Sequence, residues 1–395
     1  MQRIVRSPFY RDIYKGVLRP IGQIVLFIIA SGASLSLLMI LLAFLFSGSA
    51  IDQHVMTNNG TTLWNYTLVN LPQVLVDGVT LGFVYAVIAL GYTMVYGVLE
   101  FINFAHSEIF AIGAFVGVEI LIAINNAGLL AGGSLLNSYA WLIVAILAAM
   151  AASGLTAVLM ERIAYRPLRN APRLVPLISA IGVSFFLQDT IRLVESLTTG
   201  QFYRVIPTFG NFDTRVPIFN AAIGGTAFKM DVEVKSIWVM AAGLLMLTGL
   251  NYLVNVTKVG KAIRAVAQSQ SSASLMGIDV NKMIAITFLV GGALGGAAGT
   301  LYALKFTRID PFVGFFPGIK AFTAAVMGGI GNLTGALLGG MILGMLETFA
   351  GAYMSVFTMG AAGTEYKDIF AFLILILVLI FRPTGILGEQ VAQKA

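Results

Sequence analysis

Apolar runs of about 20 residues recur along the whole chain, and they constrain its fold more than any other feature. Hydrophobic residues make up 58% of the 395 residues and charged residues only 11%, whereas soluble domains carry about 25% charged residues. Backbone groups in lipid must find hydrogen-bond partners within their own segment, so such runs are expected to be helices. The sequence therefore predicts an all-α, polytopic integral membrane protein.

We expect about ten transmembrane segments, one of them short or re-entrant. The short one, 318–330, is apolar except for Lys320, and the glycine-rich stretch GGIGNLTG joins it to the next run as a tight turn. Backbone that leaves the helix at membrane depth is tolerated only where protein or a water-filled cavity covers it. The long runs are 21–46, 73–98, 104–124, 139–160, 174–195, 236–256, 283–304, 333–352 and 367–381.

The first apolar run, 21–46, follows a basic arm, which resembles the start of a signal peptide. The apolar region of a cleavable signal peptide is about 7–15 residues long. The run here is longer, so we expect it to be retained as a signal anchor.

Lysine and arginine are distributed unevenly along the chain, which predicts its orientation. The N-terminal arm, the loops 161–173 and 257–282 and the C-terminal tail hold most of the 24 basic residues, and none lies between Arg19 and Arg162. With a cytoplasmic N-terminus, ten crossings place all four stretches in the cytoplasm, as the positive-inside rule requires. The outer loop 196–235 fits less well because it also carries basic residues; its prolines and glycines predict a small folded cap.

Several classes of chemistry are disfavoured by the residues present. The chain has no cysteine and only His54 and His106, so we expect neither a thiolate site nor a metal site. The stretch KVGKAIR lacks the spacing of a nucleotide-binding P-loop, so we expect no ATP site and no cofactor in this chain. The basic residues form short clusters beside apolar runs, which suits lipid headgroups and not nucleic acid.

The stretch LEFINFAHSE places Glu100, His106 and Glu108 between two apolar runs. We expect a short turn near the membrane boundary, with Asn103 or Ser107 capping the following helix and Glu108 favoured by the helix dipole in its first turn. Whether the turn is only structural or takes part in gating or solute passage stays open from the residues.

Two glycine patterns and two acidic residues complete the observations. Gly291, Gly295 and Gly299 recur every four residues, as do glycines from Gly331 onward, which predicts close packing of helices. Glu347 has no charged neighbour on its own helix and is expected to face a partner subunit or a pathway. Asp77 is expected at the outer start of its helix, where it would compensate the dipole.

Four stretches resemble the permease subunits of branched-chain amino acid ABC importers, the LivH type. The stretch VDGVTLGFVYAVIALGYTMVYGVLEFINFAHSEIFAIGAF is similar to the family's signature segment, with Ser107 where glycine is usual. Further similarity lies in GKAIRAVAQSQSSASLMGIDVNKMIAITFLVGGALGGAAGTLYAL, in GIKAFTAAVMGGIGNLTGALLGGMILGMLET and in LIFRPTGILG. It covers most of 75–388, in order.

The resemblance implies a non-enzymatic transport subunit in the bacterial cytoplasmic (inner) membrane, and the distribution of basic residues places both termini in the cytoplasm. Expected partners are a homologous LivM-like permease subunit, two ABC ATPase subunits and an extracytoplasmic solute-binding protein. It divides the chain into an N-terminal arm, extra helix and outer loop (1–72), a permease domain (73–388) and a tail (389–395). Within 257–282, the residues matching the family's coupling loop are Gly260, Arg264, Ala265, Ala273 and Gly277. The candidate translocation or gating residues are Asn103, Phe104, Ala105, His106, Glu108 and Glu347.

The solute implied by the resemblance is a branched-chain or other neutral amino acid, with urea or short amides as the alternative. Two other classes remain open. A secondary transporter could couple an ion gradient through Glu108, Asp189 or Glu347 and bind substrate at the broken segment 328–335. An intramembrane enzyme using His106 with Glu108 would need a third group nearby.

Overall fold

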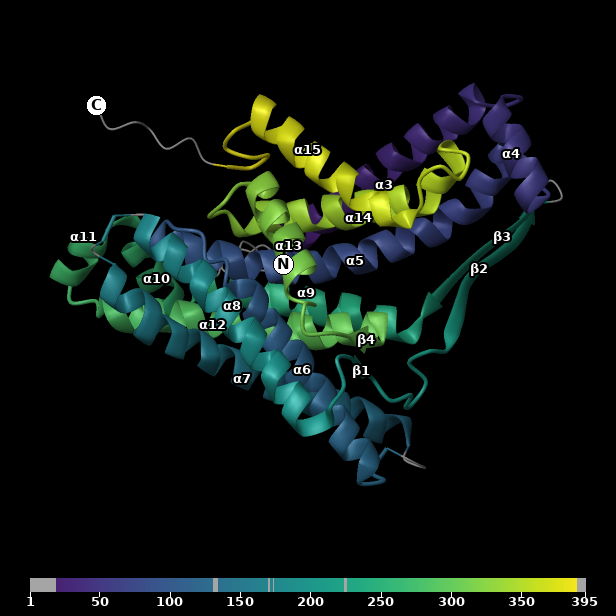
Figure 1. Ribbon diagram of the computed structural model, residues 1–395. Helices are drawn as coiled ribbons and strands as arrows, with labels where there is room; N and C mark the ends of the chain where they lie inside the picture. The colour runs from purple at the N-terminus through teal and green to yellow at the C-terminus, as the bar shows by residue number, and fades with distance from the viewer. Residues whose placement is uncertain (1–18, 131–133, 170, 173, 224–225, 389–395) are drawn as a thin grey trace, which may run out of the picture.

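The computed structural model describes residues 19–130, 134–169, 171–172, 174–223 and 226–388 (Figure 1). The basic arm before Arg19 and the tail 389–395 lie outside the described residues. The α-helices are α3 (Arg19–Leu45), α4 (Ala50–Asn59), α5 (Leu63–Leu99), α6 (His106–Asn126), α7 (Leu135–Met160), α8 (Leu174–Thr199), α9 (Val234–Val256), α10 (Lys258–Gln268), α11 (Gln270–Leu275), α12 (Val280–Phe306), α13 (Phe315–Gly328), α14 (Leu333–Phe357) and α15 (Lys367–Phe381).

Eight of the described helices are long and apolar enough to cross a bilayer, which confirms the all-α membrane fold. The predicted short segment is α13, an apolar helix of 14 residues. The last apolar run forms α15, which has 15 residues. The stretch 329–332 makes the expected tight turn between α13 and α14, with positive φ angles at Gly329 and Gly331.

Helix α5 lies at the centre of the bundle and packs against α14, α12, α13, α9 and α3, while α12 packs against α7 and α6 (Figure 1). Every residue of α5 from Thr80 to Val95 is buried. A helix that is apolar all round, as this segment is, suits such a position.

The glycines of α12 allow the close packing that their spacing predicts. A Cβ atom on Gly296 would lie 2.5 Å from the carbonyl oxygen of Ala149 in α7, and one on Gly299 would contact the carbonyl of Phe110 in α6. The hydroxyl of Thr300 donates to the carbonyl of Gly113 at 3.2 Å. In α14, a Cβ on Gly339 would contact the carbonyl of Ala324 in α13.

Two ends of the bundle can be distinguished (Figure 1). The α10 end carries α10 and α11. The hairpin end carries α4 and a hairpin of β2 (Arg215–Ile223) and β3 (Thr226–Glu233), with Arg215 opposite Glu233. There β1 (Arg204–Val205) also pairs with β4 (Arg308–Ile309). The loop expected to form a folded cap is thus built from short strands, which an otherwise helical protein can form outside lipid.

Helix α5 begins ahead of the predicted apolar run, at Leu63, where the Thr62 side chain accepts a hydrogen bond from the Asn65 amide at 3.3 Å. The prediction that Asp77 stands at the start of its helix is therefore wrong. Its carboxylate lies 3.3 Å from the Lys305 ammonium group at the end of α12, so a cation compensates it instead of the helix dipole.

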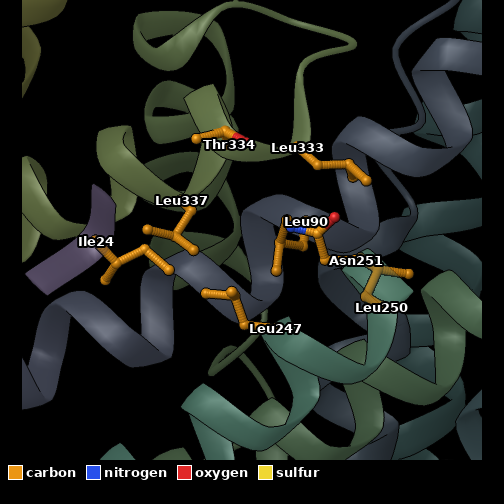
Figure 2. Close-up of a pocket in the computed structure, with 8 residues that line it drawn as sticks. All are labelled: Ile24, Leu90, Leu247, Leu250, Asn251, Leu333, Thr334 and Leu337. Carbon is orange, nitrogen blue, oxygen red and sulfur yellow. The ribbon is translucent and has the colours of Figure 1, made fainter. Parts of the chain in front are cut away.

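The N-terminal helix α3 packs along α5 and α14. Ser31 in α3 donates a hydrogen bond to the Met345 sulfur at 3.3 Å. Ile24 closes one side of a narrow apolar crevice whose other walls come from α5, α9 and α14 (Figure 2). Asn251 contributes an amide to this crevice, which is otherwise lined mainly by leucines. Helix α3 is thus part of the packed bundle.

Candidate functional site

Helix α6 begins deep inside the bundle, which is the main difference from the expected turn at the membrane boundary. His106 lies against Gly91 of α5 and Gly295 of α12. Gly91 is about 12 Å along the axis from the end of α5 and Gly295 about 22 Å from the start of α12. The chain leaves α5 at Glu100, where φ is positive, and returns inward over 101–105. The polar groups are therefore buried well inside the bundle and not at its edge.

The start of α13 meets the start of α6. A Cβ atom on Gly318 would contact the Ser107 side chain, and one on Gly314 would lie 2.8 Å from Glu108 Oε2. We call residues 103–108 and 314–318 the half-helix junction. Two helix N-termini converge there, so their partial positive charges favour a carboxylate such as Glu108 between them.

The cap of α6 differs from the prediction. Its N-cap is Ala105, with no side-chain hydrogen bond, and the Ser107 hydroxyl donates instead to the Phe104 carbonyl at 2.7 Å. Asn103 accepts a hydrogen bond from the Tyr165 hydroxyl at 2.6 Å and so anchors the junction to the π-helical segment Glu161–Tyr165 that follows α7. Neither predicted side chain can cap the helix, because each is used by a neighbouring contact. Glu108 does lie in the first turn, as predicted.

His106 is 1% exposed and packs edge-on against the Tyr92 ring, with 4.7 Å between ring centroids. Within the described residues, neither ring nitrogen has a hydrogen-bond partner of acceptable geometry, although the Ile88 backbone lies close. Residues two apart on a helix do not face each other, so His106 and Glu108 are not an acid–base pair. This arrangement gives no support to an intramembrane enzyme.

Glu108 is also 1% exposed. Its Oε1 atom lies 3.3 Å from the Ser107 hydroxyl and 3.5 Å from the Ser184 hydroxyl of α8. Its Oε2 atom has no hydrogen-bond partner in the part of the chain that the structure describes. The Phe104 ring packs in a tilted arrangement against the Phe322 ring of α13, with 5.8 Å between the ring centroids. The candidate gating residues of 103–108 are thus brought together with α13.

Glu347 belongs to a separate charged cluster. It is 2% exposed, and its Oε1 atom lies 2.9 Å from the ammonium groups of both Lys320 in α13 and Lys367 in α15. The Tyr85 hydroxyl of α5 donates to Oε2 at 2.7 Å. Asp368 completes the cluster, 2.8 Å from Lys320. Lys320 stands out in the sequence as the one charged residue of its segment. Its pairing with Glu347 could not be predicted, because the partners of Glu347 come from three other helices.

The α10–α11 loop is built as the sequence predicts, from two short helices. Thr257 caps α10 by accepting from the Gly260 amide at 3.0 Å, and a Cβ on Gly260 would collide with the carbonyls of Leu253 and Val254. Gly277 has a φ of 79° just past the end of α11, the left-handed conformation of a helix C-cap. Both glycines are thus required by the backbone.

The residues matched to the coupling loop mostly face their own chain. Ala273 is buried and Ala265 half-buried. Arg264 donates to the Val254 carbonyl and to Asn255 Oδ1, so it ties α10 to the end of α9. The tip of the loop is formed instead by Leu275 and Met276, which are 89% and 82% exposed. The sequence did not point to these two residues. Similarity to the family identifies the residues that hold the loop together, not those that are exposed at its tip.

The α10–α11 loop also contacts the segments that lead to the half-helix junction. The Gln270 side chain lies 3.5 Å from the carbonyl of Val98, at the end of α5. Arg169 donates to Asn281 at 2.6 Å and pairs with Glu161, which joins the loop after α7 to the start of α12. A displacement of the loop would therefore act directly on the end of α5, immediately before the break.

Comparison with known proteins identifies the family. The family described as branched-chain amino acid transport system, permease component, matches residues 74–379. The LivH permease protein of Escherichia coli strain K12 is 40% identical over 332 residues, covering 82% of this chain and 97% of the relative. BraD of Pseudomonas aeruginosa is 41% identical over 322 residues, with the same coverage. A probable LivM permease of Methanocaldococcus jannaschii is 28% identical over 171 residues, covering 39% of this chain and 47% of the relative.

The match begins at residue 74 and so leaves α3 and α4 outside the family region, while the junction, the charged cluster and the α10–α11 loop lie inside it. No solved structure matches the chain with significant similarity. Both the region matched and the identity to LivH and BraD extend over most of the chain. This multi-pass membrane protein therefore belongs to the family of permease components of branched-chain amino acid transport systems.

Proposed function

We propose that this chain is the transmembrane subunit of an ATP-driven importer of branched-chain or other neutral amino acids. The observation that carries the proposal is the 40% identity to LivH, a high-affinity branched-chain amino acid transport permease, over 97% of that protein. ATP binding and hydrolysis take place in separate subunits, and this chain supplies the pathway and the surface through which they act.

The α10–α11 loop is the proposed docking site for an ATPase subunit. Its exposed Leu275 and Met276 suit an apolar groove, and Lys258 and Lys261 in the first turn of α10 are exposed and add positive charge to the loop. Closure of the ATPases would push this loop against the end of α5 through the Gln270 contact. Because the chain breaks directly after α5, that movement would reach the half-helix junction and the start of α6, and so alternate access between the two sides.

The α10 end is proposed to be cytoplasmic. The loops after α7 and α9 carry clustered basic residues at that end, as the positive-inside rule requires. In a bacterium the membrane would be the cytoplasmic (inner) membrane. A solute-binding protein would then deliver solute at the hairpin end.

The second permease subunit is proposed to be a LivM-like chain. Support comes from the 28% identity between part of this chain and a probable LivM permease, since homologous subunits can pair about a shared pseudo-twofold axis. Residues 73–388 would form the permease domain of this pair. The described surface leaves the apolar sides of α8 and α15 uncovered for lipid or for such a partner.

The proposal is tested by uptake into proteoliposomes containing both permease chains, the ATPase subunits and the binding protein. We expect leucine uptake that needs internal ATP and stops when the ATPases are omitted. Uptake that continues on an ion gradient without the ATPases would instead identify a secondary transporter. Competition by urea or acetamide, without competition by leucine or other neutral amino acids, would reassign the solute.

A further inference from the structure

The hairpin end contains a cavity of about 670 Å³. It is not lined by residues of the half-helix junction or of the α10–α11 loop. Its walls come from α5, the β2–β3 hairpin, the end of α12, the middle of α14 and the start of α15. Small-molecule sites commonly have volumes of about 300–1,000 Å³. The cavity is therefore large enough for an amino acid.

The charged side chains that line this cavity differ in how much of each is exposed to solvent. Arg215 at the hairpin is 70% exposed and Asp77 38%, whereas Lys305 is 16% and Glu347 2% exposed. The cavity thus leads from a water-accessible rim to the buried charged cluster around Glu347. A solute entering from the hairpin end would meet these charges in turn.

Both signs of charge are present and partly free to bind. Lys367 is 35% exposed and contacts Glu347 at 2.9 Å, which uses one of the three donors of its ammonium group. Asp77 accepts from Lys305 and from the Gln73 amide but keeps a water-facing side. A ligand with one carboxylate and one ammonium group can use such a pair of partners without leaving a net charge buried.

The remaining lining is part polar, from Asn70, Gln73, Thr348 and Thr364, and part apolar. Val69, Val74 and Leu81 of α5 lie along one side of the cavity, and Phe306 and Ala352 come from α12 and α14. A ligand site normally combines such an apolar wall with a few polar groups that orient the ligand. The wall suits an uncharged aliphatic side chain.

We propose that this cavity is an outer binding site for a zwitterionic amino acid with an aliphatic side chain. Its carboxylate binds at Lys367, its ammonium group faces the carboxylates of the cavity, and its side chain lies on the α5 wall. The inference rests on the proposed import function. It adds the location of the site at which the chain first binds the solute after the binding protein releases it.

The absence of cysteine from the natural chain allows a direct test. Thr348→Cys places one thiol in the cavity wall, and Asn59→Cys places one on the exposed end of α4, outside the cavity. Each variant is assembled with the other importer subunits in proteoliposomes but without the binding protein, so that protection can come only from direct occupancy. The rate of labelling by a charged, membrane-impermeant thiosulfonate is then measured with and without leucine.

Leucine at ten times its half-saturating concentration leaves about a tenth of the sites free, so labelling of Thr348→Cys should slow about tenfold. Labelling of Asn59→Cys should not change. Leucinamide, which lacks the carboxylate, and 4-methylpentanoate, which lacks the ammonium group, should protect at least tenfold more weakly. Adding Lys367→Gln should weaken protection by leucine, and Lys367→Arg should restore it.

Equal labelling rates at every leucine concentration up to its solubility limit would overturn the proposal, and equal protection by 4-methylpentanoate would overturn the zwitterionic specificity. ATP-driven uptake by the same Thr348→Cys complex, with the binding protein added, is measured in parallel. Uptake without protection would reject this site while leaving the import function intact, whereas absence of uptake in the wild-type complex would count against the import function itself.

Discussion

At Gly91 the absence of a side chain determines how the helices pack locally. A Cβ atom there would overlap the His106 ring and lie 3.0 Å from the Gly291 carbonyl oxygen. The imidazole can occupy the centre of the bundle because α5 presents bare backbone to it. The same principle applies to Gly318 of α13: a Cβ atom there would overlap the Ser107 side chain at the start of α6.

We expect Gly91→Ala to destabilise the protein by about 1–3 kcal/mol, as overpacking of a close-packed interior does. The measurement is thermal unfolding of the purified protein in detergent. Gly182→Ala in α8 is the matched control: a Cβ there meets nothing within 4 Å, so it should leave the midpoint unchanged or raise it slightly.

Combining Gly91→Ala with His106→Ala should recover part of the lost stability, because the two residues are in contact and their effects are coupled. A double variant in which the two losses simply add would show that the imidazole is not what excludes the methyl group.

The buried charges of the Glu347 cluster are a second property of single residues. Lys320→Met leaves the Glu347 carboxylate with one cation fewer in a site that is 2% exposed, and breaking such a pair typically costs about 3–5 kcal/mol. We expect a lowered midpoint of thermal unfolding. The double variant Lys320→Met, Glu347→Met should be more stable than Lys320→Met alone; a double variant that is less stable would contradict the assignment of this pair.

At the scale of elements, the α10–α11 loop combines a fixed scaffold with an exposed apolar tip. Arg264 and Gly260 hold α10 against α9, and the Gly277 cap ends α11, which packs against α10 and α12. Leu275 and Met276 make almost no contact with their own chain. Such a surface contributes little to folding and is available to a partner subunit.

We expect Leu275→Asp to leave the folding of this chain unchanged and to lower the amount of ATPase subunit that copurifies with the permease pair by about tenfold, the equivalent of 1.4 kcal/mol. The control is Leu136→Asp, at the first turn of α7 on the opposite end, where the side chain is 77% exposed. Retention of the full complement of ATPase by Leu275→Asp would exclude the tip as the docking surface.

The positions of the elements in sequence were predictable to a large extent. The apolar runs marked the long helices, and Lys320 with the glycine-rich turn marked the short one, because length and hydropathy reflect the bilayer directly. The depth of α6 was not predictable in this way. In the sequence, His106 and Glu108 look like residues of a boundary turn. In the structure they are enclosed by Gly91 of the preceding helix and by Gly295 and Gly318, which lie far away in the sequence.

At the scale of the whole molecule, the α10 end and the hairpin end are predicted to face opposite sides of the membrane. Single cysteines at Leu275 and at Asn59 mark the two ends in a chain with no cysteine of its own. In intact cells, we expect an impermeant thiol reagent to label Asn59→Cys and to label Leu275→Cys only after permeabilisation. The reverse pattern would invert the orientation and remove the docking surface from the cytoplasm.

The sequence by itself determined the class of this protein, the number and order of its apolar segments and its family, because burial in lipid and family motifs are written in contiguous residues. Only the tertiary structure decided which polar groups meet. Glu347 contacts Lys320, Lys367 and Tyr85 on three other helices. The outer cavity is formed where five separate elements meet. Contacts between residues far apart in the sequence depend on how the helices pack, and a hydropathy pattern holds no information about the depth or rotation at which one helix meets another.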